Sequence, residues 1–256
     1  RSSAASDVYK RQELIRYINC LLVIDSFADY APNGLQVEGK KEIRKVALAV
    51  SASLNVINMA LAWQADLLLV HHGFFWKNES AKICSWKKKR LHAILGAHLN
   101  VAAYHLPLDA HPILGNNASL AKVLGWQIEE RVGEQNLLFL GTTEKAIEQG
   151  KLAISIENKL GRPAFLVGNP LKKVQKLAWC TGGGQGFFLE AIDQGAETFI
   201  TGEASEAQYH FAQECGVGFI AAGHHATERY GIKTLGAHIA QEFKLDTHFI
   251  DENNPF

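Results

Sequence analysis

Three short segments, far apart along this chain, combine imidazole and carboxylate side chains. The residues concerned are His71, His72, His105, Asp109, His224 and Glu228. Imidazole nitrogen and carboxylate oxygen together suit zinc, iron, manganese or nickel, and they disfavour calcium and magnesium. We therefore predict two divalent metal ions, with zinc as the default identity. The predicted ligands are His71, His72, Asp109, His224 and Glu228.

The adjacent pair His71-His72 follows a short apolar run and precedes Gly73. Within a strand, neighbouring side chains point to opposite faces, so both rings could hardly hold one ion. Where the strand gives way to Gly73, the two rings could instead serve two ions a few ångströms apart. Taken alone, an adjacent histidine pair is equally consistent with a structural role.

His224 and Glu228 are four residues apart. If residues from Ala226 onward are helical, both side chains project from one face of that helix. A carboxylate has two oxygens and can bridge two metal ions, which makes Glu228 the candidate bridge. The alternative is an ordinary His–Glu contact on a helix surface. In either case His225 would point elsewhere, into packing or beside the ligands.

Asp109 lies two residues after Pro107, which discourages a regular helix and favours a turn. A turn at the end of a strand is a good place for a carboxylate ligand. The alternative is that Asp109 binds local backbone amides, a common role for Asp in loops. His105 is a candidate for proton transfer beside the metals, and a ligand only as a lesser alternative.

These segments follow runs that read as parallel strands of an α/β fold. One apolar strand at 67–70 leads directly into His71, and a similar unit appears later, where Val46 to His71 and Leu177 to Gly202 each span 25 positions. Two related α/β lobes are therefore predicted, packed together without a low-complexity linker. Ligands of open α/β sheets gather outside the carboxyl ends of the strands, where these segments can converge.

The pattern places the first lobe at 13–125 and the second at 126–256, with the metal site between them. Residues 1–12 are small and polar, and they join an amphipathic stretch that begins near Glu13. We interpret them as a non-native extension or a disordered tail, outside the fold.

Composition narrows the class of protein. Lys plus Arg and Asp plus Glu both number 26 in 256 residues, so a nucleic-acid partner is not expected. No apolar run is long enough to cross a bilayer, and no secretion signal is evident. The four cysteines are scattered without C-x-x-C spacing, as in a reducing compartment, so we expect a cytoplasmic protein with no membrane partner.

A glycine-rich segment, 181–186, follows a predicted strand and precedes a helix. Its amides could hold an anion. However, it lacks the Gly-Lys-Ser/Thr of a P-loop and the glycine spacing of a dinucleotide site. A tight structural turn is at least as good an interpretation.

Five motifs, taken together and in this order, resemble one known family. They are Asp29-Tyr30-Ala31-Pro32-Asn33-Gly34-Leu35-Gln36, Val70-His71-His72-Gly73, His105-Leu106-Pro107-Leu108-Asp109, Thr181-Gly182-Gly183-Gly184 and Gly223-His224-His225-Ala226-Thr227-Glu228. The chain is similar from about residue 13 onward to the Ngg-interacting-factor-3-like proteins, also known as GTP cyclohydrolase 1 type 2 homologs.

The resemblance implies a two-lobed α/β fold with a dinuclear metal centre. It implies that His71 and Asp109 hold one ion, that His72 and His224 hold the other, and that Glu228 contacts both. It also implies a homohexameric ring with the metal sites facing its interior.

Two functions remain open on these residues. The first is a metal-dependent hydrolase acting on a nucleotide or a related small molecule, in which His105 or Glu228 moves protons and the metals activate water. Hydrolysis of a phosphate ester is a variant of it. The second is a non-catalytic metal-binding or regulatory ring protein. An annular nucleic-acid binder is disfavoured by the neutral charge.

Overall fold

Unbroken apolar runs form the middle strands of two separate sheets. Strand β5 (Leu67–His72) is buried along nearly its whole length, and so is β11 (Thr198–Thr201) in the other sheet. Such strands have no polar face, because helices cover both sides of a parallel sheet. At the carboxyl end of each strand, the chain therefore leaves this buried layer.

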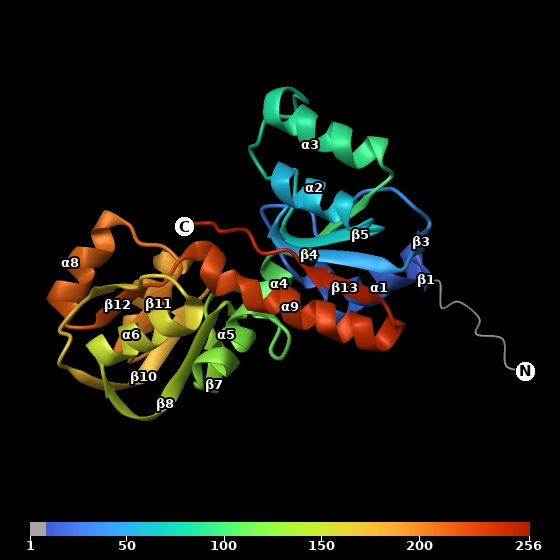
Figure 1. Cartoon of the computed structure of the whole chain (residues 1–256). Helices are drawn as coiled ribbons and strands as arrows, with labels where there is room; N and C mark the ends of the chain where they lie inside the picture. The colour runs from blue at the N-terminus through green and yellow to red at the C-terminus, as the bar shows by residue number, and fades with distance from the viewer. Residues whose placement is uncertain (1–8) are drawn as a thin grey trace, which may run out of the picture. The chain divides into compact units, whose positions relative to one another are not determined.

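The computed structural model describes residues 9–256, which divide into two units (Figure 1). Unit 1 contains the described residues up to Leu108 together with Ile232–Glu252. Unit 2 contains Asp109–Gly231 and Asn253–Phe256. A mixed α/β fold, as predicted, is confirmed in both.

Unit 1 contains a five-stranded sheet in which three parallel strands run in chain order. The strands, in spatial order, are β13 (Asp246–Phe249), β4 (Lys45–Ser51), β5, β6 (Asn100–Ala103) and the antiparallel β2 (Gly34–Val37). Helices α2 (Leu54–Ala62) and α3 (Ser85–Gly96) cover one face, and α1 (Arg11–Leu21) and α9 (His224–Phe243) lie on the other side of it (Figure 1). Ser53 caps α2 by accepting a hydrogen bond from the Val56 N–H at 3.1 Å, as its position before the apolar face predicts.

Unit 2 contains a six-stranded sheet built on a second set of three parallel strands. In spatial order the strands are β7 (Gln127–Val132), β8 (Leu138–Glu148), β10 (Lys173–Cys180), β11, β12 (Gly218–Ala221) and β9 (Phe165–Val167). Its helices are α5 (Asn116–Leu124), α6 (Gln149–Leu160), α7 (Phe188–Asp193) and α8 (Glu206–Cys215). Short 3₁₀ turns occupy Ile24–Ser26, Glu134–Asn136 and Gly184–Phe187.

One carboxylate in each unit ties together the starts of two parallel strands. In unit 1, Asp66 accepts hydrogen bonds from the N–H groups of Arg44 and Lys45, both at 3.0 Å. In unit 2, Glu197 accepts from Gln175 and Lys176 at 2.7 and 2.9 Å. Each acid directly precedes the second strand of its parallel pair, so the 25-residue spacing seen in the sequence corresponds to the same local structure in both units.

The predicted extension, residues 1–12, is described only from residue 9 onward. Residues 1–8 lie outside the described part of the chain, but Tyr9 and Lys10 form β1, which pairs with β3 (Glu42–Ile43). Arg11, only 5% exposed, donates hydrogen bonds to the Gly39 carbonyl and to Glu38. Because of these contacts, residues 9–12 belong to the fold. The small polar residues that precede them gave no sign of these contacts in the sequence.

The units also differ from the predicted limits of 13–125 and 126–256. The carboxyl-terminal strand β13 pairs in parallel with β4, so residues 232–252 complete the first sheet. Residues 109–125 belong with the second sheet, since α5 packs against α6. A strand at the end of the chain carries no sequence signal for which sheet it joins. Within the described residues, no helix is both long and apolar enough to cross a membrane.

Candidate metal centre

His71 and His72 lie at the carboxyl end of β5 with their rings side by side. The ring centroids are 4.5 Å apart, so the opposite-face rule no longer separates them where the strand ends. His71 is fully buried, and its Nδ1 donates to the Tyr104 carbonyl oxygen at 2.8 Å. Nδ1 of His72 lies 3.2 Å from the Ser51 hydroxyl. Both rings are therefore held through Nδ1.

His105 follows β6 and is held by the loop that contains Asp29. Nδ1 of His105 lies 2.7 Å from Oδ1 of Asp29, while its backbone N–H donates to the Asn33 side chain at 2.8 Å. Burial alone would raise the pKa of Asp29. The hydrogen bond and charge of His105, with the Asn33 amide and the Leu106 N–H, lower that pKa to about 2 instead. Asp29 is thus a stable carboxylate behind the imidazole.

Unit 1 gathers three imidazoles. His71, His72 and His105 each offer one nitrogen within 4.8 Å of the others, a separation consistent with metal binding. Trp76 packs against this cluster. Its ring centroid lies 5.0 Å from that of His105, in an edge-to-face arrangement, and 5.8 Å from that of His72. The sequence predicts His71 and His72 as metal ligands and His105 as a residue that transfers protons beside the metals.

In unit 2, α9 begins at His224 and carries Glu228 one turn later. Nε2 of His224 lies 3.1 Å from Oε2 of Glu228, as the four-residue spacing predicts, and its Nδ1 lies 2.6 Å from Glu203. Burial would lower the pKa of His224, but the two carboxylates outweigh it and raise the pKa to about 9. A metal ion placed here would replace the proton between Nε2 and Glu228.

Asp109 lies in α4 (Leu106–Ala110), which is a correction to the predicted turn. Pro107 occupies the first turn of this short helix, where its missing N–H costs no hydrogen bond. Oδ1 of Asp109 accepts from Nδ2 of Asn116 at 2.8 Å and from the Thr181 hydroxyl at 3.4 Å. Both of these partners are side chains, so the alternative in which Asp109 binds local backbone amides does not account for them.

The glycine-rich segment makes room for Glu228. Gly182 has φ +65°, and a Cβ there would lie 1.9 Å from Oε1 of Glu228. The Gly182 N–H donates to the Thr227 hydroxyl at 3.0 Å, which ties the segment to α9. Behind it, burial together with Asp109 and Glu228 raises the pKa of Cys180 well above normal. The segment is thus a structural turn that accommodates a carboxylate.

The hydrogen bonds of the candidate imidazole rings indicate whether these residues are suited to bind a metal. A carbonyl or carboxylate oxygen only accepts, so Nδ1 carries the proton in His71 and His105, and Nε2 carries the lone pair. Histidines that bind metals typically donate the other ring N–H to such an acceptor, which fixes the ring and the tautomer. All four candidate imidazoles, at 71, 72, 105 and 224, are anchored through Nδ1. The donor set and its support fit a divalent metal.

Sequence reasoning missed two anchoring acids, Asp29 and Glu203. Asp29 lies in the Asp-Tyr-Ala-Pro-Asn-Gly motif, before the first sheet, and nothing in its spacing links it to His105. Glu203 directly follows β11, so the rule that ligands gather at strand ends could have found it. His225 is 7% exposed and its N–H donates to the Phe256 carbonyl, consistent with its omission from the ligands.

Fold and donor set together define an α/β protein, built around a five-stranded and a six-stranded sheet, with buried His, Asp and Glu groups able to hold a metal ion. The family model for Duf34/NIF3 (NGG1p interacting factor 3) matches residues 9–255. The chain belongs to this family, which confirms the resemblance found in the sequence.

Curated relatives match over nearly their full length. A protein of Neisseria meningitidis serogroup B is 52% identical over 244 residues, which cover 95% of this chain and 98% of the relative. A protein of Yersinia pestis is 49% identical over 245 residues, with 95% and 98% covered. Both are named GTP cyclohydrolase 1 type 2 homolog.

Solved structures share the fold. The protein YbgI, described as of unknown function, is 44% identical with a TM-score of 0.93, and 97% of this chain and 100% of that one are covered. A protein of Thermus thermophilus is 34% identical with a TM-score of 0.86 and the same coverage. These similarities agree with the family resemblance found in the sequence motifs.

Proposed function

We propose that this protein is a dinuclear metal-dependent hydrolase that acts on a nucleotide or a related small molecule. In this proposal His71 and Asp109 hold one divalent ion, His72 and His224 hold the other, and Glu228 contacts both. The observation that supports it most strongly is the anchoring of every candidate imidazole through Nδ1, which presents Nε2 as the coordinating atom.

The burial of two carboxylates supports a metal centre. Glu228 is 2% exposed and Asp109 is 5% exposed. Burying a carboxylate is costly unless it is paired, and a divalent cation would pair with both.

The proposed centre would draw its ligands from both units. The chain leaves unit 1 between Leu108 and Asp109, within α4, and returns between Gly231 and Ile232, within α9. One ligand candidate, Asp109, lies at the first passage, and Glu228 lies four residues before the second. The proposal requires that these passages bring the two sets of donors together.

When bound, two divalent ions supply Lewis acidity and lower the pKa of water toward neutrality. The chain's own residues would then position the substrate and move protons. Nδ1 of His105 faces Asp29, so Nε2 carries the lone pair and could accept a proton from an attacking water. Glu228 is the second candidate for proton transfer.

The substrate class is proposed from the chemistry of the site together with the names of the relatives. An electrophilic ring carbon of a purine, or a phosphate ester, is the kind of group that paired cations polarise toward attack by water. The relatives are named as homologs of a GTP cyclohydrolase, which suggests purine nucleotides as the first compounds to assay.

Turnover of GTP and other nucleotides by the zinc-, iron-, manganese- or nickel-loaded protein tests the proposal. We expect hydrolysis that His71→Ala abolishes and that His92→Ala leaves unchanged, because His92 is exposed on α3. Equal turnover by the wild type and His71→Ala would reject it. Tight metal binding without turnover of any nucleotide would favour the non-catalytic, regulatory alternative.

We further propose a cytoplasmic homohexameric ring, in line with the family resemblance. Cys20, Cys84, Cys180 and Cys215 are all free thiols, which suits a reducing compartment. Light scattering on the purified protein should give six times the chain mass of 28.2 kDa. A monomer or dimer at micromolar concentration would contradict the ring.

A further inference from the structure

We propose that an open hollow in unit 1 binds the base of a purine nucleoside phosphate, whose phosphate ester is directed toward the metal centre. This inference rests on the proposed function and deepens it, because it assigns the two ends of the substrate to different places. It also selects hydrolysis of the phosphate ester over attack on a purine ring carbon.

The hollow lies between two loops of unit 1. The first loop includes the 3₁₀ turn at Ile24–Ser26 and continues through Asp29 and Tyr30, and the second follows β5 and contains Phe75 and Lys77. The Lys77 N–H donates to the Tyr30 carbonyl oxygen at 2.6 Å, which joins the two loops. The volume of the hollow is about 590 Å³, within the range of about 300–1,000 Å³ that is usual for small-molecule sites. It is therefore large enough for a nucleoside.

One wall of the hollow lies against His105. Asp29 lines the hollow, and its Oδ1 lies 2.7 Å from Nδ1 of His105. The ring centroid of Tyr30 lies 6.4 Å from that of His105. In the second loop, Trp76 follows Phe75 and packs edge-to-face on His105. A ligand in the hollow would therefore lie one side chain away from the imidazole that is proposed to move protons.

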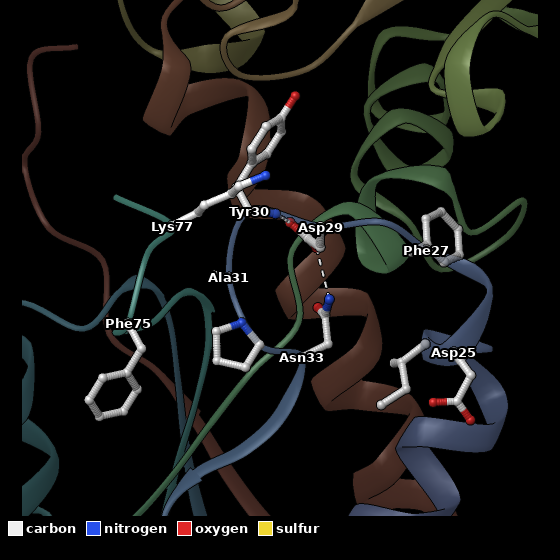
Figure 2. Close-up of a pocket in the computed structure, with 10 residues that line it drawn as sticks. Asp25, Phe27, Asp29, Tyr30, Ala31, Asn33, Phe75 and Lys77 are labelled. Atoms are coloured by element: carbon white, nitrogen blue, oxygen red, sulfur yellow. Dashed lines mark hydrogen bonds between the residues drawn. The ribbon is translucent and has the colours of Figure 1, made fainter. Parts of the chain in front are cut away.

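Aromatic side chains form much of the lining. They are Phe27, Tyr30 and Phe75, and Figure 2 shows Phe27 and Phe75 on opposite sides of Asp29 and Asn33. Tyr30 is 58% exposed and Phe75 is 42% exposed. Phe75 also has φ +66°, a left-handed conformation that bulky residues rarely adopt and that functional loops can retain. Nucleobases stack on exposed aromatic rings, because every base has a π face.

The charges that line the hollow oppose a phosphate group. Among the described residues of the lining, Asp25 and Asp29 are carboxylates and Lys77 is the one cation. A phosphate ester is itself negative, so this balance of charge repels it. The divalent ions of the proposed centre would attract it instead. An uncharged base therefore suits the hollow, and the phosphate suits the metal centre.

Asp25 indicates which base the hollow prefers. Within residues 9–256, neither the carboxylate of Asp25 nor Nζ of Lys77 has a hydrogen bond or an ion pair, so both can serve a ligand. A carboxylate only accepts hydrogen bonds. Guanine offers N1–H and N2–H₂ donors side by side on one edge, whereas adenine offers only N6–H₂ there. We therefore expect a preference for guanine.

The placement of the two ends determines the reaction. With the base in the hollow, the phosphate ester rather than a ring carbon faces the metal centre. The oxygen of water adds to phosphorus, the bond between phosphorus and the ribose 5′ oxygen breaks, and that oxygen takes up a proton. The products are an intact nucleoside and inorganic phosphate.

Guanosine binding to the full chain, treated with a chelator to remove metal, tests the hollow separately from the metal centre. Guanosine has no phosphate group, so its binding should not require metal. Saturation-transfer NMR titrations should show saturable binding, about 5-fold or more tighter than that of adenosine. Phe27→Ala and Tyr30→Ala should each weaken it about 5-fold or more, as expected for the loss of base stacking. Asp25→Asn should remove the preference over adenosine.

Matched control variants lie in unit 2. Phe165→Ala removes a ring that is 62% exposed, and Asp193→Asn neutralises an exposed carboxylate in α7. Neither should change guanosine binding. Tyr30 and Asp25 are themselves exposed, so their replacement should leave the core intact. The absence of saturable binding, or binding that Phe27→Ala, Tyr30→Ala and Asp25→Asn leave unchanged, would overturn the inference.

A second measurement compares two esters in the zinc-loaded protein, guanosine 5′-monophosphate and ribose 5-phosphate, which lacks the base. Phe27→Ala and Tyr30→Ala should raise KM for the first about 5-fold or more with little change in kcat, and should leave KM for the second unchanged. Inorganic phosphate and intact guanosine are the expected products, and an opened purine ring would overturn the inference.

The two measurements separate this inference from the proposed function. If the metal-free protein binds guanosine through Phe27 and Tyr30 but the loaded protein hydrolyses neither ester, the base site stands and the hydrolase fails. If both esters are hydrolysed and the variants change neither KM, the hydrolase stands and the base site fails.

Discussion

The two units provide different donors from similar positions in similar sheets. Unit 1 contributes three imidazoles, and its acid Asp29 lies behind one of them. Unit 2 contributes two buried carboxylates, Asp109 and Glu228, with the imidazole of His224 between Glu228 and Glu203. In the proposed centre, the nitrogen-rich side would favour zinc, iron, manganese or nickel over magnesium and calcium, and the oxygen-rich side would compensate their charge.

The two sides should therefore respond differently to substitution. In the proposed centre, removing an imidazole from unit 1 would take one ligand from one ion and leave the charge unchanged. Removing Glu228 from unit 2 would take a contact from both ions and one negative charge with it.

Glu228→Gln should have the largest effect. The amide keeps the shape of the side chain but lacks the charge, so we expect both ions to bind more than about 100-fold more weakly. His72→Ala should weaken only one of the two. Zinc content per chain after dialysis distinguishes these outcomes, and a Glu228→Gln protein that keeps two ions at wild-type affinity would contradict the bridging role.

Gly182→Ala should displace the carboxylate of Glu228, because residue 182 packs directly against it. The added Cβ would meet Oε1 of Glu228, and the left-handed backbone at φ +65° would cost about 1–2 kcal/mol in any other residue. We expect a lower melting temperature together with weak metal binding. Gly186→Ala is the control, because a Cβ at Gly186 meets nothing within 4 Å. Normal metal binding in Gly182→Ala would show that Glu228 can move aside.

The sequence predicted the strand ends and the helix face of this site, because apolar runs and four-residue spacing are local signals. β5 ends at His72 and α9 places His224 and Glu228 on one face, as their spacing predicts. Pro107 led to the wrong prediction of a turn at Asp109, because proline disfavours the interior of a helix but not its first turn.

What the sequence could not show depends on contacts between remote segments. Asp29 meets His105 across 76 residues, and β13 joins β4 from the opposite end of the chain. Neither contact leaves a periodic pattern, because each pairs a loop or an edge strand with a segment chosen only by the tertiary fold. The position of the histidines at strand ends was therefore predictable, and the contact of Asp29 with His105 was not.

Glu203→Gln should weaken metal binding by about 10- to 100-fold, because a neutral amide holds Nδ1 of His224 less firmly than a carboxylate does. Glu206→Gln provides a matched control on the neighbouring helix, where Glu206 pairs with the exposed His210. Competition with a chromogenic chelator measures both affinities. Equal affinities would mean that Glu203 does not orient the ligand.

Asp66→Asn and Glu197→Gln compare the carboxylates that tie the strands together in the two units. Burial would raise the pKa of Asp66, but Lys40 and the N–H groups of Lys45 and Arg44 lower it below its usual 3.8. The pKa of Glu197 is likewise held below 4.5, since its hydrogen bonds from Gln175 and Lys176 outweigh burial.

Each folded-state pKa is depressed, so each contribution to stability is complete above the unfolded-state pKa and is lost as the pH falls through the folded one. We expect Asp66→Asn to cost about 1–3 kcal/mol near neutral pH. Glu197→Gln should cost less, because Glu197 is less buried. Urea unfolding at pH 7 and below pH 4 checks both, and a variant whose deficit does not shrink in acid would contradict the assignment.

The most direct test of the metal centre is anomalous scattering from crystals of the full chain grown with zinc. The account predicts two peaks per chain, one against His71 and Asp109 and one against His72 and His224, with Glu228 in contact with both. Zinc peaks that lie away from these residues, or no bound zinc at saturating concentration, would contradict it.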